Sequence, residues 1–118
     1  MKDSRELKVW QKAHQLALEV YRQSAQLPTE ERFGLTAHLR KTAVSIPSNI
    51  AEGCGRQGDR ELTRFLNIAS GSAAELEYQL LLAHDLTYLP AQVHRQLDAL
   101  VGEVKRMLYR FIHSLAEA

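Results

Sequence analysis

The chain has 118 residues, of which 45% are hydrophobic and 25% charged, and this composition is typical of a globular protein with one core. A formal net charge of +1 predicts no strong overall attraction to nucleic acid or to an anionic membrane. The chain has a single cysteine, so we expect no disulfide framework. Its N-terminus is charged, and no apolar run approaches the roughly 20 residues of a membrane span. We therefore expect one cytoplasmic domain over residues 1–118, with no membrane partner.

Four helices are predicted from apolar residues that recur three and four positions apart. We expect them over residues 7–26, 33–54, 59–86 and 91–115, separated by prolines 28 and 90 and by the glycines between 53 and 58. No segment shows the strict alternation of a half-buried strand. Four helices with short connections indicate an all-α, up-down-up-down antiparallel four-helix bundle.

The predicted second helix carries a proline in its middle. Pro47 lacks a backbone donor and clashes with the carbonyl of Ala43, yet the apolar spacing continues from Leu39 to Ile50. We therefore expect one helix that is bent at Pro47 rather than two helices. Ser45 and Ser48 have short hydroxyls that could bond backbone groups freed near the bend.

The predicted third helix contains Gly71 and Ser72 in its interior. The glycine costs about 1 kcal/mol of helix propensity relative to alanine, so we expect an offsetting gain. The expected gain is the close approach of a neighbouring helix, with the bend at Pro47 as the candidate neighbour. Glu52 is expected to pair with a basic residue or to cap backbone groups, rather than to act as one of two catalytic carboxylates.

No residue set predicts catalysis, a cofactor or a metal. Residues 53–58 match G-x-G-x-x-G, but a helix is predicted before them where the dinucleotide fingerprint requires a strand. A weaker alternative is that backbone amides at the start of the third helix hold an anion. Cys54 has no histidine placed beside it by the sequence, and the histidines show no H-x-x-x-H or E-x-x-H spacing. We expect a protein that is not an enzyme.

Basic residues gather around the second connection: Arg40, Lys41, Arg56, Arg60 and Arg64. The last three recur every four residues, which places them on one face at the start of the third helix. Residues 32–64 hold six Lys or Arg against three Asp or Glu, a local excess of three positive charges. Two interpretations stay open, namely a solvated face with local ion pairs or a patch that binds the phosphates of RNA or DNA.

Several segments carry a more specific pattern: AVSIPSNIAEG at residues 43–53 followed by Arg56, LKVWQKA at 7–13, FGLT at 33–36, GS at 71–72 and ELEYQL at 75–80. Together they resemble the bacterial four-helix-bundle family of proteins encoded in intervening sequences of large-subunit ribosomal RNA. The resemblance covers nearly the whole chain in the expected order. It departs at His38, where the family usually has glutamine, and at residues 41–42, where arginine and alanine are common.

The resemblance implies a four-helix bundle whose structural motif comprises Ser45, Pro47, Asn49, Glu52, Gly53, Gly71 and Ser72. The family is related to accessory variability proteins of diversity-generating retroelements, which implies a closed homo-oligomer, a pentamer, that engages structured nucleic acid and a reverse transcriptase.

Apolar residues beyond the helical stripes also favour an interface between subunits: Trp10, Leu81, Leu82 and Tyr109. We therefore expect a non-enzymatic homo-oligomeric bundle that binds structured nucleic acid through its basic residues. The alternative is a protein-only scaffold that binds another helical protein.

Overall fold

The computed structural model describes residues 3–117. It contains four α-helices, α1 (Lys8–Ser24), α2 (Leu35–Cys54), α3 (Asp59–Asp85) and α4 (Ala91–Ala116). Two short 3-10 turns, η1 (Ser4–Glu6) and η2 (Thr29–Glu31), precede α1 and α2.

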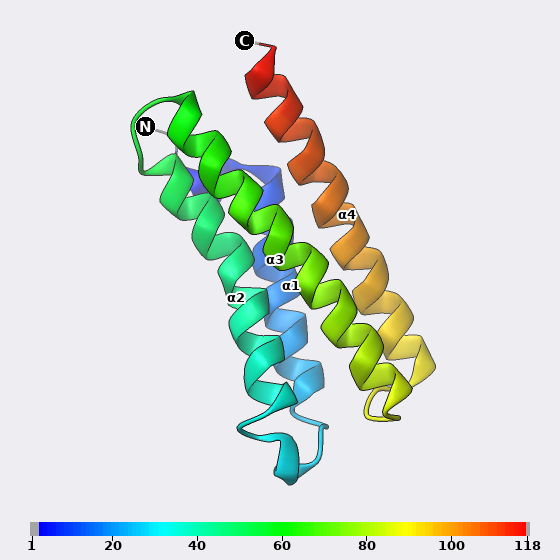
Figure 1. Ribbon diagram of the computed structural model, residues 1–118. Coiled ribbons are helices and arrows are strands. Elements are labelled where there is room, and N and C mark those ends of the chain that lie inside the picture. Colours follow the sequence, from blue (N-terminus) through cyan, green and yellow to red (C-terminus); the bar gives the residue numbers. More distant parts are fainter. Residues whose placement is uncertain (1–2, 118) are drawn as a thin grey trace.

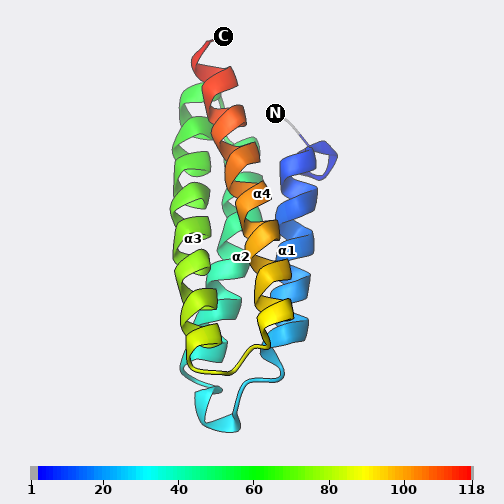
Figure 2. The ribbon, with the colours of Figure 1, turned by 90° about the vertical axis from the view of Figure 1, so that its right-hand side faces the viewer.

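The helices alternate in direction along an elongated bundle of 45 × 23 × 20 Å (Figures 1 and 2). The connection between α2 and α3 lies at one end with the C-terminal part of α4, and the other two connections lie at the opposite end. Each helix packs against its neighbours in the sequence, and α1 and α4 close the ring. The predicted all-α, up-down-up-down bundle is confirmed, and every helix boundary lies within two residues of its predicted position.

The core is formed by one buried stripe from each helix. Because consecutive members of each stripe are three or four residues apart, they point to the same side and meet at the bundle axis. The fully buried side chains of this core include Leu16, Val20, Leu39, Ile46, Ile50, Leu66, Leu76, Leu80, Val101, Val104 and Leu108. Alanines at 43, 69 and 73 are also fully buried, and their small side chains let α2 and α3 approach closely.

α2 continues through Pro47 as one helix, as predicted. The side-chain amide of Asn49 donates to the Ser45 carbonyl at 2.8 Å and to the Ser45 hydroxyl at 3.0 Å. The expectation that the Ser45 hydroxyl bonds a freed backbone group is wrong, because its Oγ lies 2.8 Å from the Ser72 Oγ of α3. Ser45 faces the neighbouring helix, so its hydroxyl links α2 to α3.

The glycine at which α2 and α3 approach most closely is Gly53, not Gly71. A Cβ at Gly71 would meet nothing within 4 Å, so the expected close neighbour of this residue is absent. A Cβ at Gly53 would lie 2.9 Å from the Phe65 Cβ and 3.0 Å from the Leu62 Cδ1. The close approach thus occurs at the end of α2, while only Ser72 of the Gly71–Ser72 pair contacts α2.

A hydrogen bond joins the two connections at the far end of the bundle. The Tyr88 hydroxyl donates to Glu31 Oε2 at 3.1 Å, which links the α3–α4 connection to η2. The hydrogen bond to the Glu31 carboxylate, with lesser contributions from burial and from acidic neighbours, raises the pKa of Tyr88. The neutral phenol therefore holds these two connections together.

Candidate nucleic-acid interface

The candidate interface is the arginine cluster, which we define as Arg56, Arg60 and Arg64. Arg56 lies in the connection between α2 and α3, and the other two lie in the first turns of α3. The guanidinium carbons of Arg56 and Arg64 lie 5.3 and 5.0 Å from the centre of the Phe65 ring. Two cations therefore meet at one phenyl ring, which favours them through its quadrupole and restricts their positions.

Acidic side chains lie among these arginines. Arg56 pairs with Glu52 at 3.0 Å, so Glu52 has the basic partner that the sequence suggested, four residues further along the chain. Arg64 pairs with Glu61 at 3.8 Å. These side chains are 42–62% exposed, and such exposed pairs contribute about 0–1 kcal/mol. The pairs are therefore weak enough to be exchanged for contacts to phosphate.

Arg60 is exposed and forms no ion pair with any residue between 3 and 117. Asp59 and Glu61 lie in the same first turn of α3. Counting Glu52, the cluster has as many acidic neighbours as arginines, so the excess positive charge expected from residues 32–64 does not gather here.

Arg40 and Lys41 do not extend the arginine cluster, contrary to expectation. They lie some 15 residues from Arg56 along a continuous helix, which corresponds to about 20 Å. Arg40 instead packs against the end of α1: its Nε donates to Ser24 Oγ at 2.9 Å and its Nη2 to the Tyr21 carbonyl at 3.2 Å. Lys41 is exposed on the side of α2 that faces α3.

Phe65 is a component of this site that the sequence analysis did not single out. The residue is buried, with 8% exposed, and its ring also contacts two guanidinium groups. A sequence signal was present in the aromatic residue directly after Arg64. This signal did not indicate a contact with arginine, because Phe65 also fits the apolar spacing of α3.

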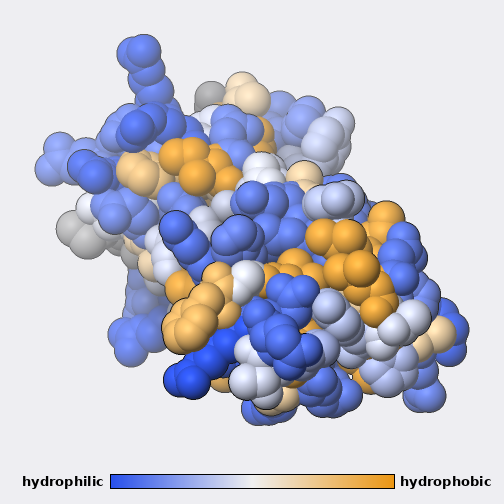
Figure 3. All heavy atoms as spheres, turned by 60° about the horizontal axis from the view of Figure 1, so that its bottom comes forward, coloured by the Kyte–Doolittle hydropathy of each residue, from blue (hydrophilic) through white to orange (hydrophobic). Residues whose placement is uncertain are grey.

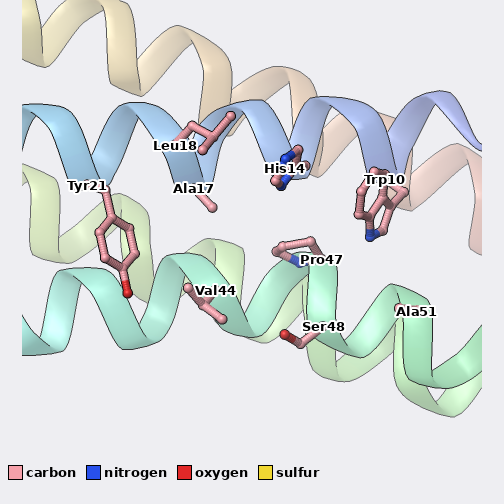
Figure 4. A pocket seen from close by; sticks show the side chains of 9 residues that line it. All are labelled: Trp10, His14, Ala17, Leu18, Tyr21, Val44, Pro47, Ser48 and Ala51. Carbon is pink, nitrogen blue, oxygen red and sulfur yellow. The ribbon is translucent and has the colours of Figure 1, made fainter. Parts of the chain in front are cut away.

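A second surface feature is an apolar groove between α1 and α2, with a volume of about 420 Å³. Side chains from both helices project into the gap between them (Figure 4). Trp10 stacks on His14 with ring centres 5.0 Å apart, and Leu18, Tyr21 and Val44 are 40–46% exposed. Pro47 lies on the wall opposite α1. We call this feature the α1–α2 groove.

Other exposed apolar side chains lie outside this groove. Leu81 is 45% and Tyr109 62% exposed, while Leu82 is partly buried against the core. Phe33, in the connection between α1 and α2, is 86% exposed. Figure 3 brings forward the end of the bundle that holds the α1–α2 and α3–α4 connections, and it shows apolar side chains in separate patches among polar ones.

Residues 3–117 also lack the arrangements that a metal site or a membrane-spanning helix would need. Among residues 3–117 no three His, Cys, Asp or Glu side chains are grouped so that they could hold a metal ion. None of the helices described is both long enough and apolar enough to cross a membrane. Cys54 is buried at the end of α2, and a helix precedes the glycine-rich connection, so the fingerprint at residues 53–58 lacks its strand.

Comparison with known proteins agrees with this architecture. The chain is similar to a protein of unknown function from the S23 ribosomal protein family of Bacteroides thetaiotaomicron VPI-5482, with a TM-score of 0.83 and 24% sequence identity. The match covers 89% of this chain and 95% of that one, and at this identity it shows the fold. No curated protein matches the chain. The model of one family matches residues 5–110, and the chain therefore belongs to the 23S rRNA-intervening sequence protein family.

Proposed function

We propose that this protein is a non-enzymatic, homo-oligomeric helical bundle that binds structured nucleic acid through the arginine cluster. The observation that carries the proposal is the pair of guanidinium groups held against Phe65, beside an exposed Arg60 that forms no ion pair within residues 3–117. Arginines positioned in advance lose less side-chain entropy when they bind phosphate.

The arginine cluster alone supplies few phosphate contacts. Three contacts per subunit give modest affinity, and a net charge of +1 adds little steering. A closed ring of identical subunits multiplies the same cluster, so assembly and nucleic-acid binding support each other. The α1–α2 groove is our candidate for the surface that a second copy covers. Its lining is mostly apolar and includes Trp10, Leu18 and Tyr21, and exposed apolar surfaces of this kind usually mark interfaces. The pentamer implied by the family resemblance is our expected assembly.

The test is binding of a labelled structured RNA and of a DNA duplex, measured by fluorescence anisotropy over a salt series. Each phosphate contact contributes roughly 0.7–0.9 to the magnitude of the negative slope of log K against log salt concentration, so the three arginines predict a slope of about −2 to −3 for each subunit that engages the nucleic acid. Replacement of Arg56, Arg60 and Arg64 by glutamine should remove this slope and weaken binding for all sequences. Sedimentation of both proteins reports whether the assembly is kept.

The matched control replaces Arg95, Arg106 and Arg110 of α4 by glutamine, which removes the same charge from exposed positions elsewhere. This variant should bind almost as tightly as the parent. Equal losses in both triple variants would mean that only net charge matters, and no binding by the parent at low salt would reject the proposal. In the second case the α1–α2 groove favours the alternative, a protein-only scaffold that binds another helical protein.

A further inference from the structure

A polar groove of about 340 Å³ lies between α2 and α3, away from the arginine cluster and from the α1–α2 groove. We call it the α2–α3 groove. All the side chains that line it are polar: His38, Lys41, Thr42, Ser45, Glu75 and Gln79. Its size lies within the range of pockets that hold small ligands or single bases.

The inner part of the α2–α3 groove contains an amide without a hydrogen bond. Gln79 is 9% exposed, and its Oε1 is buried with no partner. Buried acceptors are nearly always satisfied, so this oxygen requires an explanation. No residue between 3 and 117 holds the amide through a hydrogen bond, and the last torsion of glutamine is broad, so the amide can turn its oxygen to a donor in the groove.

The outer part of the groove presents two opposite charges. Lys41 and Glu75 are both exposed, and within the described chain neither forms an ion pair. The lysine offers donors, whereas the carboxylate and the Gln79 oxygen offer acceptors. A matching ligand therefore presents one acceptor beside two or more adjacent donors.

We propose that the α2–α3 groove binds an unpaired guanine base. Guanine carries the acceptor O6 next to the donors N1–H and N2–H₂ on one edge, which suit the Lys41 ammonium as donor and the oxygens of Glu75 and Gln79 as acceptors. Adenine places an amino group where Lys41 needs an acceptor, and its N1 would face the carboxylate. Cytosine presents one amino donor followed by two acceptors on this edge, and uracil presents one N–H between two acceptors, so each places an acceptor against an oxygen of Glu75 or Gln79.

The position of the groove fits a strand that also contacts the arginine cluster, and this part of the inference rests on the proposed function. Arg64 and Glu75 are eleven residues apart on α3, which is about three turns, so they lie on one face separated by about 17 Å. Gly71 lies between them on that face, and a Cβ there would meet nothing within 4 Å. A few nucleotides can therefore follow the surface of α3 without meeting a side chain at Gly71.

Isothermal titration with the four nucleoside monophosphates tests the inference without requiring the arginine cluster. Guanosine monophosphate should bind at least about fivefold more tightly than the other three, the lower limit of discrimination by a good base contact. Inosine monophosphate, which lacks the N2 amino group, should bind more weakly than the guanosine form. Glu75→Gln should abolish the preference, whereas the control Glu77→Gln, two residues further along α3 and outside the groove, should keep it.

A hairpin RNA with one unpaired guanine, compared with the same hairpin carrying adenine there, shows whether the base comes from free nucleotide or from RNA. The arginine triple variant should keep binding guanosine monophosphate while it loses the hairpin. Equal binding of all four nucleotides, or no binding of the guanosine form, overturns the inference and leaves the proposed function to its own salt-dependence test. Displacement of guanosine monophosphate by a free amino acid, whose carboxylate and ammonium also complement Lys41 and Glu75, would likewise reassign the groove.

Discussion

The contrast between Gly53 and Gly71 yields a prediction whose magnitude follows from the structure. A Cβ at Gly53 would lie 2.9 Å from the Phe65 Cβ and 3.3 Å from the Leu62 carbonyl oxygen, whereas a Cβ at Gly71 would meet nothing within 4 Å. Carbon atoms pack best at about 3.5–4.0 Å. A rotamer change can move Leu62 Cδ1, which would lie at 3.0 Å, but the Phe65 Cβ is fixed to the backbone of α3 and the Leu62 oxygen belongs to it. The contact with these two atoms can be relieved only if the helix itself moves.

Alanine at Gly71 should stabilise the protein by about 1 kcal/mol, the difference in helix propensity between glycine and alanine. Alanine at Gly53 gains at most the same propensity and adds the cost of overpacking, typically about 1–3 kcal/mol. The difference in unfolding free energy between the two variants therefore isolates the packing cost. For a chain of this length it corresponds to roughly 4 °C in Tm for each kcal/mol.

Urea denaturation followed by circular dichroism, at one protein concentration throughout, measures both free energies. We expect Gly71→Ala above the parent and Gly53→Ala at least about 1 kcal/mol below Gly71→Ala. Equal stabilities of the two variants would refute the close approach of α2 and α3 at Gly53. A lower stability of Gly71→Ala than of the parent would instead indicate that Gly71 faces a neighbouring helix.

Two further predictions concern the connection between α3 and α4. Thr87 is the one non-glycine residue between 3 and 117 with a positive φ, of 66°, and it follows the end of α3, where glycine is preferred. Thr87→Gly should therefore raise the urea midpoint by the equivalent of about 1 kcal/mol. An unchanged or lower midpoint would contradict this. The pKa of Tyr88 is raised in the folded state, so its contribution to stability is complete below the pKa of an unfolded tyrosine and is lost as the pH rises through the folded value. The stability difference between the parent and Tyr88→Phe should therefore be constant in neutral solution and shrink above about pH 10, and a difference independent of pH would argue against the bond to Glu31.

The helices and their order follow from the sequence alone. Apolar residues three and four positions apart, with breaks at Pro28, Pro90 and the glycines after α2, indicate four helices because helix periodicity is a local property of the chain. The continuation of α2 through Pro47 was predictable for the same reason, since the apolar stripe keeps its phase on both sides of the proline.

Which faces meet could be decided only by the tertiary structure. The rotation and axial offset of each helix result from the packing of the whole core, so the sequence could not show that α2 and α3 approach each other at Gly53 rather than at Gly71. Spacing within one helix was enough to place Arg60 and Arg64 on the same face of α3. The contact of Arg40 with the end of α1 joins two helices, so only the tertiary structure could show it. Lys41 and Gln79 lie on different helices and share one groove because α2 and α3 run antiparallel in this register.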